Sequence, residues 1–94
     1  MSAPQDKTVL WRERLAESIS EEVLREVYRA IEKFPPFNSA HEGWAVLMEE
    51  VDELWEEVKK NKNVRDKVKM RTEAIQCAAM AIRFVMDVNG ENQA

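Results

Sequence analysis

The sequence predicts an all-α fold, a small bundle of about four helices per protomer that is completed by oligomerisation. Only two Gly and three Pro occur among the 94 residues, so turns are few and helices can be long. The hydrophobic fraction of 45%, with three Trp, three Phe and five Met, exceeds what one thin helical layer can cover. A chain this short buries only about two thirds of its surface on folding, which also favours self-association.

A single domain is expected over residues 1–94, with flexible tails at 1–7 and 90–94. Two helices are predicted in the first third of the chain. The first is short and covers residues 8–17, and the second starts at a Ser cap, Ser18 or Ser20, because Glu residues follow in the first turn. Apolar residues of the second helix recur at spacings of three and four, as expected for an amphipathic helix. They are Val23, Leu24, Val27, Ile31 and Phe34.

Pro35 and Pro36 are predicted to end this helix, since neither donates a backbone hydrogen bond and each disfavours helix in the residue before it. The segment 35–43 is therefore expected to be an ordered loop. A third helix is predicted from residue 41 or 44 to 60. A fourth is predicted from residues 64–66 to 88, with Asn89-Gly90 as its C-terminal stop.

Charge and composition restrict the class of partner. The formal net charge of −4 argues against nucleic-acid binding as the main role, whereas small phosphates remain possible where a divalent cation reverses the local charge. The single Cys77 cannot form an internal disulfide and is interpreted as a structural thiol. No secretory signal pattern opens the chain, and the longest apolar run, residues 77–82, is too short to span a bilayer. No membrane partner and a cytoplasmic location are expected.

The third predicted helix carries an acidic row beside its apolar face. With 100° per residue, Glu50, Glu53 and Glu57 form one row along the flank of the apolar arc of this helix. Like charges at these spacings repel one another, and partial burial raises the cost, so a divalent cation would stabilise the row. The alternative is a solvated acidic face balanced by nearby lysines. Those lysines are Lys59, Lys60 and Lys62.

The fourth predicted helix has two different faces. Its main apolar stripe is formed by Ile75, Ala78, Ala79, Ile82, Val85 and Met86. The opposite side carries Lys69, Glu73, Gln76, Met80 and Arg83. Such a helix is expected to be central in the assembly, where Glu73 would need a partner. If the last two helices pack antiparallel, Glu50 and Glu53 can meet Glu73 and Gln76.

These residues resemble the signature of the MazG-like, all-α nucleoside triphosphate pyrophosphohydrolases, a compact phage-type branch in particular. The family has EExxE on one helix and ExxD on the next. The first half is present as Glu49-Glu50-Val51-Asp52-Glu53, and the second as Glu73-Ala74-Ile75-Gln76, with Gln in place of Asp. The sequences flanking the two halves also resemble this branch, at residues 41–45 and 78–83, and the resemblance covers about residues 20–88.

The resemblance implies cleavage of a nucleoside triphosphate between its α and β phosphates, giving monophosphate and pyrophosphate. It implies Mg²⁺, or Mn²⁺, bound by Glu50, Glu53 and Glu73, with Gln76 at the fourth ligand position. The metal would act as a Lewis acid and lower the pKa of water. Glu49 would orient or activate water, or support the ligands, and Glu53 would be catalytic as well as ligating. Family members are dimers or tetramers, so a homodimer or homotetramer is expected.

Four further residues are candidates for substrate binding. His41 could contact a base or a phosphate, Trp44 could stack on a base, and Lys69 and Arg83 could neutralise phosphate. Each has a structural alternative: a local cap for His41, core or interface packing for Trp44, and an ion pair with a carboxylate for the two cations. A non-catalytic helical module that binds a nucleotide or a protein partner is the rival to the enzyme, because the second motif is incomplete at Gln76.

Overall fold

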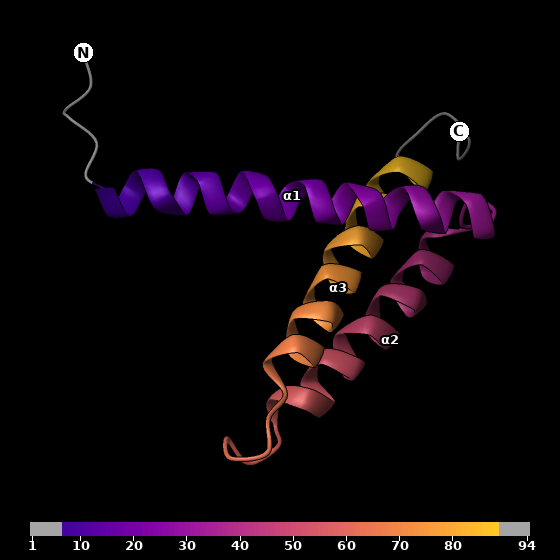
Figure 1. The fold of residues 1–94 in the computed structure, drawn as a ribbon. Helices are drawn as coiled ribbons and strands as arrows, with labels where there is room; N and C mark the ends of the chain where they lie inside the picture. Colours follow the sequence, from indigo (N-terminus) through magenta and orange to yellow (C-terminus); the bar gives the residue numbers. More distant parts are fainter. Residues whose placement is uncertain (1–6, 89–94) are drawn as a thin grey trace.

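The computed structural model describes residues 7–88 and is all-helical over that range, as predicted (Figure 1). It has three helices, α1 (Lys7–Lys33), α2 (Ala40–Val58) and α3 (Lys67–Val88). Residues 1–6 of the predicted tail at 1–7, the predicted tail at 90–94 and the predicted stop at Asn89-Gly90 lie outside the described residues. No strand occurs in this part of the chain, and none of its helices has the length and hydropathy needed to cross a membrane.

The predicted helix boundary between residues 17 and 20 is wrong. One helix, α1, runs continuously through it, so residues 7–88 contain three helices where four were expected. Ser20 does not cap a helix; its hydroxyl donates to the carbonyl of Ala16 at 2.8 Å. A Ser within a helix satisfies its hydroxyl in this way, and no Gly or Pro interrupts the stretch. Lys7, expected in the N-terminal tail, is the first residue of α1.

Local hydrogen bonds fix both ends of α2. Ser39 is the N-cap and accepts from the backbone N–H of Glu42 at 3.0 Å, while the Glu42 carboxylate accepts from the backbone N–H of Asn38 at 2.9 Å. At the other end, Nε of Arg65 donates to the carbonyl of Val58 at 2.8 Å. These contacts satisfy backbone groups that the helix leaves unpaired.

The connection between α2 and α3 is short and ends at a second cap. Asp66 accepts from the backbone N–H groups of Val68 and Lys69 at 3.0 and 3.1 Å, which starts α3. Because the connection is short, α2 and α3 form an antiparallel hairpin, and α1 lies across its open end (Figure 1). The predicted third and fourth helices correspond to α2 and α3 within a few residues at each end.

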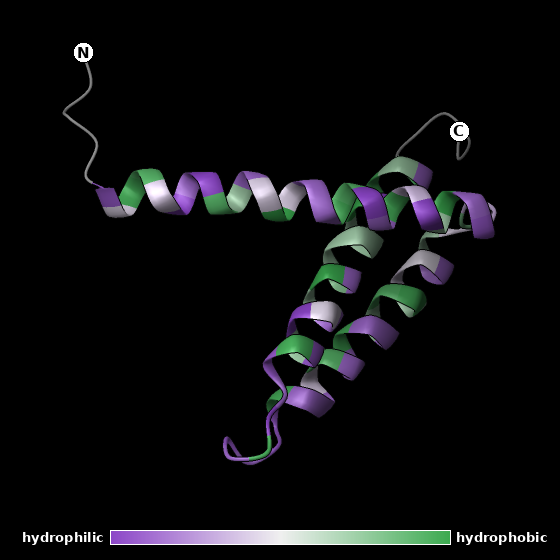
Figure 2. Ribbon diagram, in the orientation of Figure 1, coloured by the Kyte–Doolittle hydropathy of each residue, from purple (hydrophilic) through white to green (hydrophobic). Residues whose placement is uncertain are grey.

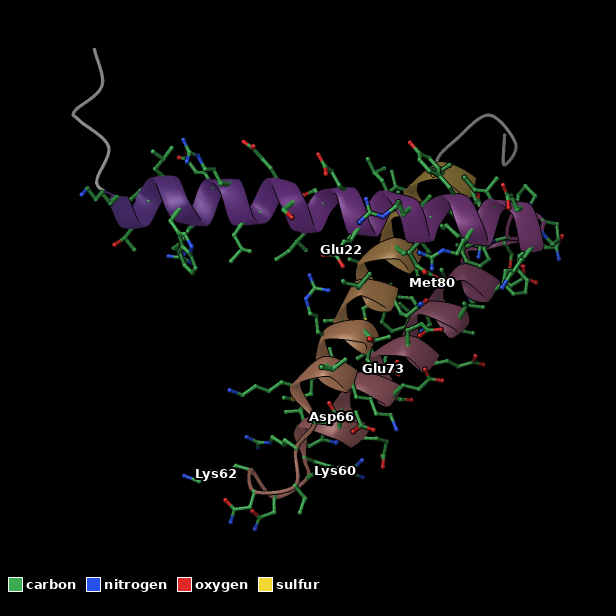
Figure 3. The ribbon with its side chains drawn as sticks, in the orientation of Figure 1. Glu22, Lys60, Lys62, Asp66, Glu73 and Met80 are labelled. Atoms are coloured by element: carbon green, nitrogen blue, oxygen red, sulfur yellow. The ribbon has the colours of Figure 1, made fainter. Side chains whose placement is uncertain are left out.

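Only the C-terminal half of α1 contributes to the core. Val23, Val27 and Ala30 lie one turn apart and are buried against α3, where Ala79 and Met80 complete the apolar cluster with Phe37 of the loop after α1. A double ion pair between Glu22 and Arg71 joins the same two helices beside this core (Figure 3). The N-terminal half of α1 extends past the hairpin, and hydrophobic residues occur along it (Figure 2). The side chains of Val9, Trp11 and Leu15 there are exposed.

Hydrogen bonds and ring contacts hold the loop after α1 against the C-terminal end of α3. Arg83 is 4% exposed, and its guanidinium donates to the carbonyl of Pro35 at 3.1 Å and lies 4.4 Å from the centre of the Phe37 ring. Asp87 lies 3.5 Å from the same guanidinium and accepts from the backbone N–H of Phe37 at 3.2 Å. With the core and the Glu22–Arg71 pair, these contacts hold α1 in its position relative to the hairpin.

The predicted apolar faces of the last two helices are only partly buried. Ile75, Ala78 and Ala79 pack against the α1 side of the core, but Ile82, Val85 and Met86 are 37 to 61% exposed. On α2, the apolar arc is turned partly outward. Trp55 is 56% exposed, whereas Glu57 of the acidic row is 6% exposed. Buried polar residues such as Glu57 and Arg83 therefore lie beside apolar ones in the packing of the hairpin, and part of the predicted apolar surface faces outward.

Candidate metal and phosphate site

The facing sides of α2 and α3 bring three carboxylates together. Glu50, Glu53 and Glu73 each offer an oxygen, and these three oxygens lie within 4.8 Å of one another. Glu50 and Glu53 are three residues apart and share one side of α2. Figure 3 shows Glu73 on the side of α3 that faces α2. Glu50 and Glu73 are half-buried and Glu53 is exposed, so the cluster lies at the margin of the hairpin and is open to solvent.

Crowding of the carboxylates changes their protonation. Burial, together with the charges of Glu53, Glu73 and Glu49 and a hydrogen bond to Glu53, raises the pKa of Glu50 to about 7. Burial and Glu53 also raise the pKa of Glu73, although Lys69 acts in the opposite direction. Protons therefore remain on the cluster near neutral pH, which is how carboxylates in contact relieve their repulsion without a cation.

Gln76 and Glu49, the other two predicted site residues of these helices, border the cluster. Both line a cavity of about 470 Å³ that Glu50 also lines. Gln76 lies one turn after Glu73 on α3 and is half-buried, and Glu49 is exposed. The cavity lies where α1, α2, α3 and the loop after α1 meet, and of the three cluster carboxylates Glu50 lines it.

Of the four predicted substrate-binding residues, only Arg83 lines this cavity, and its guanidinium already contacts Pro35, Phe37 and Asp87. Nζ of Lys69 lies 3.4 Å from the Glu57 carboxylate. Lys69 therefore forms an ion pair with a carboxylate, which was the structural alternative to phosphate binding. His41 and Trp44 are exposed on the first turns of α2, and neither is among the lining residues of the cavity.

Glu57, the third member of the predicted acidic row, is separate from the cluster. Its carboxylate accepts from Nζ of Lys60 at 2.8 Å and pairs with Lys69 of α3. Lys60 and Lys69 lower the pKa of this carboxyl below its ordinary value. The alternative interpretation, in which lysines balance the acidic row, therefore applies to Glu57. Within residues 7–88, no lysine forms an ion pair with Glu50 or Glu53.

Cys77 lies next to the cluster and is half-buried. Burial and the charges of the nearby carboxylates raise the pKa of its thiol. A thiol with a raised pKa is mostly protonated at neutral pH and reacts slowly. This agrees with the interpretation of Cys77 as a structural residue.

The α1 wall of the cavity was not predicted from the sequence. Glu26, Arg29 and Lys33 line it, and Phe34 follows at the end of the helix. The spacing of three and four residues places these side chains on one face of α1, a signal that the sequence contains. The orientation of that face toward the cluster depends on the loop contacts of Arg83 and Asp87, and these could not be predicted from spacing.

In comparisons with known proteins, no family model matches the chain, and no curated protein or solved structure matches it significantly.

Proposed function

We propose that this protein is a Mg²⁺-dependent pyrophosphohydrolase that converts a nucleoside triphosphate to the monophosphate and pyrophosphate. The observation that carries the proposal is the convergence of Glu50, Glu53 and Glu73 beside a cavity. The resemblance of Glu49–Glu53 and Glu73–Gln76 to the MazG-like signature supports the same reaction.

The donor set fits a hard divalent cation. In octahedral coordination with Mg–O distances of 2.0–2.1 Å, adjacent ligand oxygens lie about 2.9 Å apart and opposite ones about 4.1 Å apart. The oxygens of the three glutamates lie within 4.8 Å of one another, so a small movement of exposed Glu53 suffices for them to share one ion. Mg²⁺ keeps several waters and binds substrate phosphates, which agrees with a cluster open to a cavity.

In this proposal each side chain has a separate role. Glu50, Glu53 and Glu73 hold the cation, which supplies Lewis-acid polarisation of phosphate oxygens. Gln76 contributes a neutral carbonyl oxygen at the fourth position, so the site has one formal charge less than the family signature provides. Glu49, exposed in the wall of the cavity, orients the attacking water and accepts its proton.

We further propose that the protein acts as a homodimer or homotetramer. The radius of gyration is 16.4 Å, whereas a compact chain of this length would have about 12 Å. Exposed apolar side chains occur on all three helices, among them Trp11, Trp55 and Val85. Light scattering should give a mass of at least twice 11.0 kDa at micromolar concentration. A monomeric mass would contradict this part of the proposal.

Pyrophosphate release from a panel of ribo- and deoxyribonucleoside triphosphates, with and without Mg²⁺, tests the reaction. We expect release to depend on Mg²⁺ and to be lost in Glu53→Gln. Asp52→Asn is the matched control, because it removes the same charge from an exposed neighbouring position of α2 and should keep activity. Absence of pyrophosphate with every nucleotide would contradict the enzyme proposal. Both variants should retain the helical circular dichroism signal.

A further inference from the structure

The cavity beside the carboxylate cluster has walls of opposite charge. The α1 wall carries Arg29 and Lys33 together with Glu26, and the α2 wall carries Glu42, Glu49 and Glu50. Its volume of about 470 Å³ is within the ordinary range for small-molecule sites. The rings of Phe34 and Phe37 line the end near the loop after α1, which makes that end apolar.

Several charged side chains around the cavity already have partners. Arg83 is bound to Pro35 and Asp87, and the Glu42 carboxylate accepts two hydrogen bonds from Asn38. Arg29 has one partner, Glu26, which is three residues away on the same helix at 2.8 Å. The Arg29 side chain is 60% exposed, and ion pairs between neighbouring turns of one helix contribute little. Lys33 forms no ion pair within residues 7–88.

The charges on the two walls of the cavity indicate which class of ligand can bind there. A free anion in the cavity would be repelled by Glu49 and Glu50, and a free cation would be repelled by Arg29 and Lys33. A complex of a divalent cation with a polyphosphate satisfies both walls when its metal faces α2 and its phosphate oxygens face α1. Arg29 and Lys33 are four residues apart, so both can contact one phosphate chain.

We propose that Arg29 and Lys33 bind the phosphate chain of a cation–polyphosphate ligand, while the carboxylate cluster binds its metal. This inference rests on the proposed function and assigns the residues that hold the phosphates. Charge-assisted hydrogen bonds from Arg and Lys are stronger than neutral ones, and Arg can bind two phosphate oxygens at once. The two side chains therefore contribute to ligand affinity, and removing them should not weaken binding of the metal alone.

Calorimetric titration with inorganic tripolyphosphate in Mg²⁺ tests the inference. The double variant Arg29→Gln with Lys33→Gln should bind about 100-fold more weakly than the parent, or about ten-fold for each charge. The matched control is Arg14→Gln with Lys62→Gln, which removes the same charge from exposed positions that do not line the cavity. The control should bind like the parent. Arg29→Lys with Lys33→Arg should keep most of the affinity, because both charges remain.

Metal binding, measured separately as the rise in melting temperature with Mg²⁺, distinguishes this inference from the proposed function. We expect the double variant to respond to Mg²⁺ at least as strongly as the parent, because two repelling charges are removed, whereas Glu53→Gln should lose the response. Equal tripolyphosphate affinity in the double variant and its control would overturn the inference and leave the metal site intact. If the parent responds neither to Mg²⁺ nor to tripolyphosphate, both the inference and the proposed function are wrong.

Discussion

Asp87 of α3 accepts a hydrogen bond from the backbone N–H of Phe37, 50 residues earlier in the chain, at 3.2 Å. The same carboxylate lies 3.5 Å from the guanidinium of Arg83, which is buried against the Phe37 ring. These contacts hold the loop after α1 on the end of the hairpin. Together with the apolar core and the Glu22–Arg71 pair, they hold α1 across the hairpin, where it encloses the cavity.

Replacing Asp87 by Ala should lower stability and alter the cavity. The change leaves the buried Arg83 without its carboxylate, and breaking a buried pair in this way costs about 3–5 kcal/mol. Urea unfolding should therefore show a lower free energy of unfolding. The control is Asp52→Asn, which removes an exposed charge and should change stability by no more than about 0.5 kcal/mol. Equal stability of the two variants would show that Asp87 does not anchor the loop.

Gly43 lets the hairpin close around Phe84. A β-carbon at this position would lie 2.8 Å from Cδ2 of Phe84 and 3.1 Å from Cδ2 of Phe37. In a helix Ala is normally more stable than Gly by about 1 kcal/mol. We expect Gly43→Ala to lower the melting temperature despite that preference, because the rings must move.

A matched test of Gly43 uses Ala45, which is exposed on the same turn of α2. Ala45→Gly measures the helix preference without the steric effect and should cost about 1 kcal/mol. If Gly43→Ala instead stabilises the protein by that amount, the two rings adjust freely and the close approach is not a constraint.

How much of this site could be predicted depends on the kind of contact. The helical spacing placed Glu50 and Glu53 on one side of α2, and the short connection before Asp66 predicted an antiparallel partner carrying Glu73. Both are local properties of the chain. The continuous α1 was missed because Ser20 can either cap a helix or bond to the carbonyl of Ala16 within one, and the local sequence does not distinguish these conformations.

The cavity depends on contacts between residues distant in the chain. Arg83 bonds to Pro35, 48 residues away, and Asp87 to Phe37, 50 residues away. No periodicity within one helix encodes the position at which α1 crosses the hairpin. The basic residues of α1 were visible in the sequence, but their role depends on that crossing.

Glu50 should make the metal-free protein less stable as the pH rises. Its folded-state pKa of about 7 lies above the ordinary value of 4.5, so the folded state binds more protons than the unfolded state between these pH values. Stability is then highest below about pH 4.5 for this group and decreases toward pH 7. We expect the melting temperature in chelator to fall from pH 5 to pH 8 for this reason.

Glu50→Gln should remove most of that slope, because a neutral amide at position 50 cannot release a proton. Asp52→Asn, an equal loss of charge on the exposed side of α2, should keep it. Saturating Mg²⁺ should also flatten the slope in the parent, since a bound cation replaces the protons on the cluster. If Glu50→Gln and the parent in saturating Mg²⁺ both keep the slope of the metal-free parent, the titrating group lies outside the cluster.

Gln76→Asp restores the charge that the family signature has at this position. Without metal, four carboxylates would face one another across α2 and α3, so the variant should melt below the parent in chelator. A ligand that binds only the folded state stabilises it by mass action, and an added negative ligand should strengthen Mg²⁺ binding. We therefore expect a lower melting temperature in chelator and a larger rise on addition of Mg²⁺. Pyrophosphate release should increase as well.

Ala81→Asp is the control for Gln76→Asp, because it adds the same charge to an exposed position of α3. The control should lose stability through its weaker helix preference and respond to Mg²⁺ like the parent. Gln76 borders the same cavity as Glu50, so an extra carboxylate there should act directly on the cation. If Gln76→Asp and Ala81→Asp show the same Mg²⁺ response, Gln76 is not a ligand. The metal site would then consist of the three glutamates alone.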